Sequence, residues 1–260
     1  MIFCIDIGNT NIKYAVFDGD TLKASFRVNS HRISTADEYG VVVRDLLKAA
    51  EISLSDIDGV IMSSVIPSLN YTMEHMCRDY LGHKPLIVGP GIKTGLNVRV
   101  DNSREVGSDI IVDSVSAIKK YGGKGQPLIC IDFGTATTFD IINEKSELIG
   151  AVIAPGIKGS LDSLVNNTAS LPAIELEKPP SVIAKNTVNC MQAGIIYGFA
   201  GLVSNIVANI KKELGRDDVK VIATGGMSGI IFKEVDCIDV VDRMLTLNGL
   251  KIIYNLNEKV

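Results

Sequence analysis

Cysteine, histidine and runs of basic residues are scarce in this chain of 260 residues. Its five cysteines are scattered and never form a Cys-x-x-Cys pair, which argues against a disulfide framework or a zinc site and favours a reducing, cytoplasmic location. The chain has only three histidines, so we expect no histidine-built metal centre. With 26 Lys+Arg against 30 Asp+Glu and no basic run, the sequence gives no electrostatic basis for nucleic-acid binding.

The chain also lacks the basic and long apolar N-terminal regions of an export signal. One internal segment, residues 186–210, contains no charge and carries Gly194, Gly198 and Gly201. Its length and composition are typical of a membrane span, but Gln192 and several asparagines interrupt it. We therefore expect a buried core helix with a glycine face, and no membrane association.

The two halves of the chain begin alike. Asp6-Ile-Gly-Asn-Thr10 and Asp132-Phe-Gly-Thr-Ala136 each follow a short apolar run, and they lie close to half a chain length apart. Each is followed by the alternating pattern of a β-hairpin. The repeat predicts a pair of duplicated α/β domains, residues 1–122 and 123–260, with a cleft between them and a junction within residues 122–127.

Helices and strands alternate through the rest of the sequence. Ser34-Thr-Ala-Asp37 matches a capping box before a helix, and Pro67 is suited to open a helix that runs to Leu81. The other predicted helices are residues 105–121, a helix after Pro155, and 246–257, and the other predicted strands are 59–66, 86–88 and 219–223.

The repeated motif has the composition of a phosphate-binding turn. A glycine after a buried strand lets backbone N–H groups approach an anion, and the preceding carboxylate can hold a metal ion or its water. One copy, Asp6-x-Gly8-x-Thr10, is explained as well by a tight turn that the aspartate caps. Two copies favour paired phosphate loops for a nucleoside triphosphate. Thr224-Gly225-Gly226 is a weaker third element, which permits the close approach of a ring or ribose.

These motifs together resemble the superfamily of acetate kinase, sugar kinases, Hsp70 and actin, whose members bind ATP through phosphate-1, phosphate-2 and adenosine turns. Within it, the sequence resembles type III pantothenate kinases over essentially its whole length. The resemblance rests on Asp6-Ile-Gly-Asn-Thr-Asn11, Thr94-Gly-Leu96, Glu105-Val-Gly107 with Asp109, Asp132-Phe-Gly-Thr-Ala-Thr-Thr138, Pro155-Gly-Ile157, Thr168-Ala-Ser-Leu-Pro172, Asn186-Thr187 and Gly225-Gly226.

The resemblance implies an α/β fold of two duplicated ribonuclease H-like (actin-like ATPase) domains with an interdomain ATP cleft. It implies ATP-dependent phosphorylation of the pantothenate hydroxyl to 4'-phosphopantothenate, the first step of coenzyme A biosynthesis. The implied cofactors are Mg²⁺ with ATP and a monovalent cation, potassium or ammonium. The implied partners are pantothenate and a second copy of the chain in a cytoplasmic homodimer.

The resemblance also implies roles for individual residues. Asp109 accepts the hydroxyl proton, Asp132 holds the monovalent cation, and Asp6 contacts Mg²⁺ through water. Without the resemblance, Asp109 would be interpreted as a carboxylate that stabilises a helix N-terminus. The implied ATP-binding residues are Asp6, Ile7, Gly8, Asn9, Thr10, Asn11, Ile12, Lys13, Thr135, Gly225 and Gly226. The implied substrate-binding residues are Gly107, Ser108, Asp109 and Thr187, the last from the partner of the homodimer.

Two positions depart from the family pattern. The family usually has Arg where Ile110 stands and Tyr where Val100 stands. That arginine is expected to bind the pantothenate carboxylate, and Arg99 or Arg104 are the cations nearby that can replace it. The departures leave two alternatives to a pantothenate kinase: a kinase of the same fold with another hydroxyl acceptor, and a non-catalytic nucleotide-binding regulator.

Overall fold

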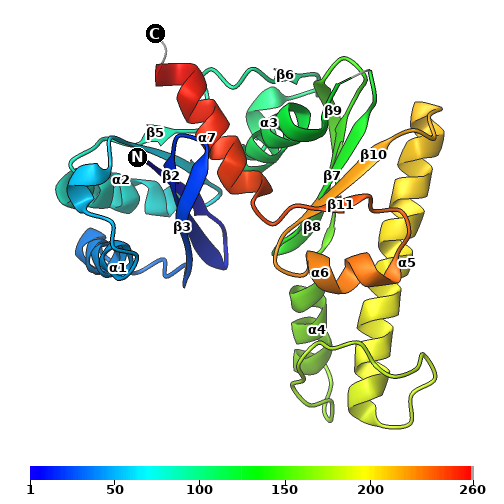
Figure 1. The fold of residues 1–260 in the computed structure, drawn as a ribbon. Coiled ribbons are helices and arrows are strands. Elements are labelled where there is room, and N and C mark those ends of the chain that lie inside the picture. Colours follow the sequence, from blue (N-terminus) through cyan, green and yellow to red (C-terminus); the bar gives the residue numbers. More distant parts are fainter. Residues whose placement is uncertain (124, 259–260) are drawn as a thin grey trace. The chain divides into compact units, whose positions relative to one another are not determined.

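The computed structural model describes residues 1–123 and 125–258 (Figure 1). Its internal contacts group the chain into two compact units. Unit 1 contains Met1–Leu96, Asp101–Ser116 and the chain from Met244 onward, and unit 2 contains Asn97–Val100 and Ala117–Arg243. This division differs from a single boundary after residue 122, because the last helix packs on the first strands of the chain. Residue 124, inside the predicted junction, lies outside the described residues.

Unit 1 is built on a five-stranded sheet of order β3-β2-β1-β4-β5. Strands β1 to β3 form an antiparallel meander, and β4 and β5 continue the sheet in parallel with β1. The strands are β1 (Ile2–Ile7), β2 (Asn11–Asp18), β3 (Thr21–Asn29), β4 (Gly59–Ser64) and β5 (Leu86–Ile87).

Unit 2 repeats this topology. Its sheet has the order β11-β10-β7-β8-β9-β6, in which β7, β8 and β9 form the meander and β10 and β11 are parallel to β7. The short strand β6 adds to the β9 edge. The predicted duplication of ribonuclease H-like units is therefore confirmed. The strands are β6 (Asn97–Val98), β7 (Leu128–Phe133), β8 (Ala136–Ile142), β9 (Glu147–Pro155), β10 (Lys220–Thr224) and β11 (Val240–Val241).

Helices cover both faces of the unit 1 sheet. On one face, Phe3, Ile5 and Tyr14 form a buried core with the helices α1 (Ala36–Ala49) and α2 (Pro67–Leu81). On the other face, Cys4 and Phe17 pack with α3 (Ser108–Tyr121) and α7 (Leu245–Glu258). Because successive side chains of a strand point to opposite faces of the sheet, neighbouring residues of each strand lie in different cores.

Two helix starts differ from the sequence expectation. The capping box of α1 is formed by Thr35 and Glu38, not by Ser34 and Asp37, because the longer glutamate side chain reaches the Thr35 N–H at 2.6 Å. Helix α3 begins at Ser108 after a short 3₁₀ turn over Ser103–Glu105, instead of at residue 105.

The long helix of unit 2, α5 (Thr187–Leu214), corrects a second expectation. Its buried face is formed by residues such as Ile196, Val203 and Val207, whereas Gly194, Gly198 and Gly201 are exposed. The prediction of a glycine face is correct, but the prediction that this face is buried is wrong for this chain. Within residues 1–123 and 125–258, α5 is the one helix long and apolar enough to cross a membrane. Unit 2 also contains the helices α4 (Ile157–Asn166) and α6 (Ser228–Ile231).

Candidate functional site

The first glycine-bearing turn joins β1 to β2 and is led by a buried carboxylate. Asp6 lies opposite Lys13 on β2 and Ser63 on β4, its in-register neighbours in the sheet. The Lys13 Nζ is 3.2 Å from Asp6 Oδ2, and the Ser63 hydroxyl donates to Asp6 Oδ1 at 2.9 Å. Both carboxylate oxygens are thus held in place, and a cation stands beside the turn.

The turn itself is narrow. The N–H of Gly8 donates to the carbonyl of Asn11 at 3.0 Å, while Asn9 and Thr10 at the tip are exposed. This exposed tip is where the sequence predicts contact with an anion. The predicted residues from Asp6 to Lys13 therefore lie on one strand–turn–strand element of unit 1.

The N-terminus of α3 is tied to the end of β4 in the same unit. The Ser64 N–H donates to Ser108 Oγ at 3.1 Å, and the Ser108 hydroxyl donates to the Ser64 carbonyl at 3.0 Å. This reciprocal pair fixes the first turn of α3 at the same sheet end as Asp6. Asp109 follows immediately, and its Oδ1 accepts the N–H of Ile110 at 3.0 Å.

Burial raises the pKa of Asp109 above that of an ordinary aspartate. The nearby negative charge of Asp6 raises it further, whereas the hydrogen bond from the Ile110 N–H and the charge of Lys13 lower it. Electrostatic coupling with Asp6 and Lys13 shows that unit 1 brings these three predicted residues together. A carboxylate of raised pKa is a better proton acceptor than a fully solvated one.

Gly107 completes this helix start. A Cβ at residue 107 would overlap the Asp109 carboxylate, so only glycine leaves that side chain its present position. Gly107 and Asp109, two of the predicted substrate-binding residues, thus approach each other closely at the start of α3.

The second turn, in unit 2, joins β7 to β8 and has the same plan. Asp132 is the residue before the last in β7, and the N–H of Gly134 donates to the carbonyl of Ala136 at 3.0 Å. The turn packs against the start of α4, because a Cβ on Gly156 would overlap the Thr135 carbonyl. Gly156 is the N-cap of α4, so the positive end of that helix lies beside Thr135.

The Gly225 turn lies next to Asp132 in the same unit. Gly225 has a φ of +90°, and its Cβ position would overlap Asp132 Oδ1 and lie 2.6 Å from the Phe133 backbone. Glycine thus fulfils two requirements here, a positive φ and a close approach. The close approach places an Asp132 carboxylate oxygen against this turn, and carboxylate oxygen is a ligand that suits a hard cation.

We expect Gly225→Ala to destabilise the protein by more than about 1 kcal/mol, because alanine tolerates neither the φ nor the overlap. The midpoint of urea unfolding and the affinity for MgATP should both fall. Gly215→Ala is the matched control, since Gly215 has a φ of +62° but open space at its Cβ position. If Gly215→Ala weakens MgATP binding as much as Gly225→Ala does, a local role for Gly225 is contradicted.

The remaining predicted residues are more dispersed. Thr187 is exposed at the start of α5, and Ile110 is half-buried on α3. Arg99 is engaged in unit 2, where it donates to Glu147 at 3.2 Å. Two arginines, Arg99 and Arg104, were named as alternatives for binding the substrate carboxylate. Arg104 in unit 1 is therefore the one with no ion pair among the described residues.

The described part of the chain contains no group of three or more His, Cys, Asp or Glu residues that could hold a metal ion. Single carboxylates such as Asp6 are sufficient for Mg²⁺ when substrate phosphates and water supply the other ligands.

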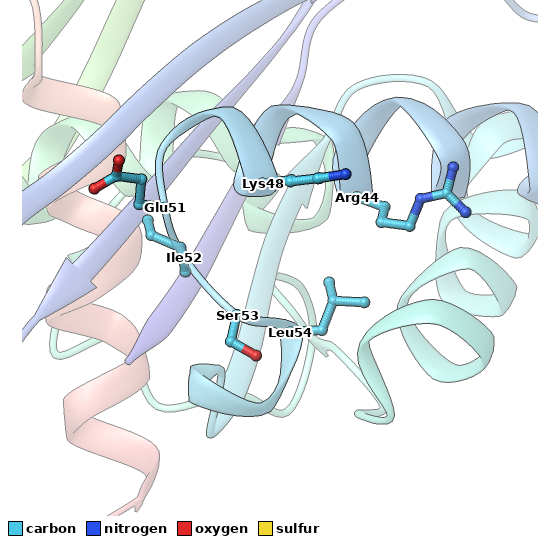
Figure 2. A pocket seen from close by; sticks show the side chains of 6 residues that line it. All are labelled: Arg44, Lys48, Glu51, Ile52, Ser53 and Leu54. Carbon is cyan, nitrogen blue, oxygen red and sulfur yellow. The ribbon is translucent and has the colours of Figure 1, made fainter.

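One cavity of unit 1 lies away from these turns. It measures about 320 Å³ and lies between α1 and the following loop (Figure 2). Its lining contains no glycine turn and none of the predicted site residues. The lining residues are Arg44, Lys48, Glu51, Ile52, Ser53 and Leu54.

Two residues of the site escaped the sequence analysis as functional candidates. Ser63 orients Asp6, but an isolated serine at a strand end carries no recognisable pattern. Gly156 was noted within Pro155-Gly-Ile157, and only the fold reveals that it makes room for the Thr135 turn.

Comparisons with known proteins show the family of this chain. A family model described as type III pantothenate kinase matches residues 2–209. The type III pantothenate kinases of Moorella thermoacetica and Geobacillus kaustophilus are each 50% identical over 257 residues, which cover 99% of this chain and 100% and 98% of those proteins. Among solved structures, a ROK family glucokinase from Streptomyces griseus has a TM-score of 0.54 at 12% identity and covers 100% of this chain and 99% of its own. The last similarity concerns the fold alone.

Proposed function

Because this chain belongs to the type III pantothenate kinases, which phosphorylate pantothenate in coenzyme A biosynthesis, we propose that Asp109 is the base that accepts the proton of the pantothenate hydroxyl. The observation that carries this proposal is the half-buried Asp109 carboxylate, whose pKa is raised by desolvation and which interacts electrostatically with Asp6 and Lys13. Neither a kinase for another acceptor nor a non-catalytic regulator is favoured, since relatives at 50% identity over nearly the full chain are pantothenate kinases.

In this proposal, Asp109 orients the hydroxyl oxygen toward the γ-phosphorus of ATP. Phosphoryl transfer through a loose transition state needs the nucleophile in line and releases its proton late, so positioning matters more than basicity. The Ser64–Ser108 pair supports the base, because it fixes the first turn of α3 on the sheet. Gly107 and Ser108 contact the acceptor beside it.

Residues 6–13 bind phosphate groups of ATP in this proposal, with Lys13 supplying a positive charge near them. The turn at Thr135 binds phosphate as well, and its place beside the α4 N-terminus supports that role. Gly225 and Gly226 contact the adenosine. The charge that develops on the transferred phosphoryl group is stabilised by these fixed donors.

Two cations complete the proposed site. Mg²⁺ accompanies ATP, and Asp6 contacts it through a water molecule. A potassium or ammonium ion is held by Asp132, whose carboxylate faces the Gly225 backbone. When bound, such cations neutralise phosphate charge, and the residues named here only have to supply oxygen ligands.

The experiment that tests the activity measures ADP formation by the purified protein with ATP, Mg²⁺ and either potassium or ammonium. We expect ADP to form only when pantothenate is added. No turnover at millimolar pantothenate would contradict the assignment. Turnover with a different hydroxyl compound would favour another acceptor, and MgATP binding without any turnover would favour a regulator.

We also propose that the protein is a homodimer in which Thr187 reaches the site of the partner. The exposed glycine face of α5 supports this, because small residues let helices approach closely. Val182 and Ile183 just before the helix are large, apolar and exposed, which is unusual for a surface that meets only water.

Mixed dimers test this arrangement. We expect Asp109→Asn and Thr187→Ala homodimers to be nearly inactive, whereas a mixed dimer from differently tagged chains recovers about half of the wild-type rate, since one of its two symmetric sites is intact. If Thr187 serves the site of its own chain, each site of the mixed dimer carries one substitution and the rate does not recover.

The raised pKa of Asp109 predicts the pH dependence of the reaction. The base must be deprotonated, so kcat/KM should fall as the pH decreases through its pKa, at higher pH than for an ordinary aspartate. A pH–rate profile with saturating Mg²⁺ measures this acid limb. A profile that stays flat down to the usual aspartate range would contradict the assignment of Asp109.

A further inference from the structure

The segment after β3 forms a second wall of the Gly8 turn. The Ser30 N–H donates to the Thr10 carbonyl at 3.0 Å, and the Ser30 hydroxyl donates to the Gly8 carbonyl at 2.6 Å. The backbone on both sides of Asn9 is therefore tied to Ser30. Two residues later, the Arg32 guanidinium donates to Asn9 Oδ1 at 3.1 Å.

A buried tyrosine holds this wall from behind. The Tyr39 hydroxyl accepts the His31 N–H at 3.0 Å and donates to the His31 carbonyl at 2.9 Å. Tyr39 is buried in the unit 1 core on α1, and the Thr35 capping box fixes the start of that helix. The backbone between Ser30 and Arg32 is thus attached to the turn on one side and to the core on the other.

The contact with Arg32 determines which way the Asn9 amide points. A guanidinium can only donate, so the Asn9 side chain must present its oxygen to Arg32 and its two N–H donors elsewhere. Four guanidinium N–H donors of Arg32 remain for another acceptor. Both side chains are exposed and offer donors at the tip of the turn.

The charge of Arg32 is uncompensated within unit 1. No carboxylate pairs with its guanidinium among residues 1–123 and 125–258, although arginines 44, 78, 99 and 216 each have such a partner. An unpaired guanidinium held at a glycine turn suits a phosphate, which it can bind with two parallel hydrogen bonds.

We propose that Arg32 is a phosphate ligand of the bound nucleotide, and that it also orients the Asn9 amide as a second donor to the same phosphate chain. The proposal rests on the ATP site proposed above and adds a cation from outside residues 6–13. Ser30 and Tyr39 act as positioning residues, since they hold the Arg32 backbone without reaching the ligand.

The test is the affinity for MgATP measured by calorimetry. Loss of a charge-assisted contact predicts that Arg32→Gln raises Kd by roughly 10- to 150-fold. Arg32→Lys should raise it less, because it keeps the charge and loses the planar fork. Arg44→Gln is the matched control: it removes the same charge from an exposed arginine of unit 1, far along α1, and should leave Kd unchanged. An unchanged Kd for Arg32→Gln would overturn the proposal.

A double substitution separates direct contact from positioning. If Arg32 touches phosphate, Arg32→Gln still raises Kd in an Asn9→Ala background. If its effect disappears there, Arg32 acts only through Asn9, and the assignment as a ligand is wrong. If the wild-type protein binds no MgATP, the ATP site itself is wrong. If the wild type binds MgATP and Arg32→Gln does not change Kd, only the role of Arg32 is wrong.

Discussion

Asp109→Asn is expected to lower kcat by roughly 10²- to 10⁴-fold, the contribution usual for a positioned general base. Asparagine preserves the shape of the side chain but cannot accept the hydroxyl proton. The Kd for MgATP should stay close to the wild-type value, because the residues proposed for ATP lie on other elements. Steady-state kinetics and calorimetry measure the two quantities separately.

The stability of this variant provides an independent check. Since the folded-state pKa of Asp109 is raised, its carboxyl stabilises the fold when protonated, and that contribution is lost as the pH rises through its pKa. At neutral pH the partly desolvated charge is therefore unfavourable, and Asp109→Asn should not lower Tm. Asp101→Asn, an exposed aspartate of the same unit, is the control and should keep full activity. An unchanged kcat in Asp109→Asn would remove this residue from the proposed role.

Ile110→Arg is expected to lower the KM for pantothenate by roughly 10- to 150-fold, the value of one charge-assisted contact to the substrate carboxylate. It restores the residue usual for the family at a half-buried position next to the base. The KM for ATP should change little. Initial rates with each substrate varied in turn give both constants.

The structure bears on which other arginine can bind the pantothenate carboxylate in place of the one missing at position 110. Arg99 is paired with Glu147, which leaves Arg104 as the better candidate. Val41→Arg on α1 adds the same charge to an exposed position of unit 1 and should leave the pantothenate KM unaltered. If Ile110→Arg leaves this KM unchanged or raises it, the acceptor pocket recognises the carboxylate in another way.

The sequence was sufficient to predict the duplicated turns and hairpins, because those features are local. Asp6 and Asp132 are each the residue before the last in an apolar strand, and a glycine two residues later opens the turn that the structure contains. The helix over Pro67–Leu81 is also confirmed at both ends, since proline and a glycine with positive φ mark them.

Other features depend on contacts between distant segments. The exposure of the α5 glycines could not be predicted, because composition does not say which face of a helix meets the sheet. The unit to which α7 belongs is decided by packing against β1, at the other end of the chain. The partners of Asp6 and Asn9 come from β4 and from the segment after β3, which no local pattern links to the first turn.

Because α7 covers one face of the first sheet, the order in which the chain leaves the ribosome matters. Unit 2 has its residues complete once Arg243 has been synthesised, but the core around Cys4 and Phe17 lacks Leu250 and Ile253 until the last residues emerge. The first strands to be synthesised are thus among the last to have this apolar face completely buried. Truncations within the last helix should consequently damage the opening strands, and nascent chains stalled before residue 244 should expose that apolar face to chaperones.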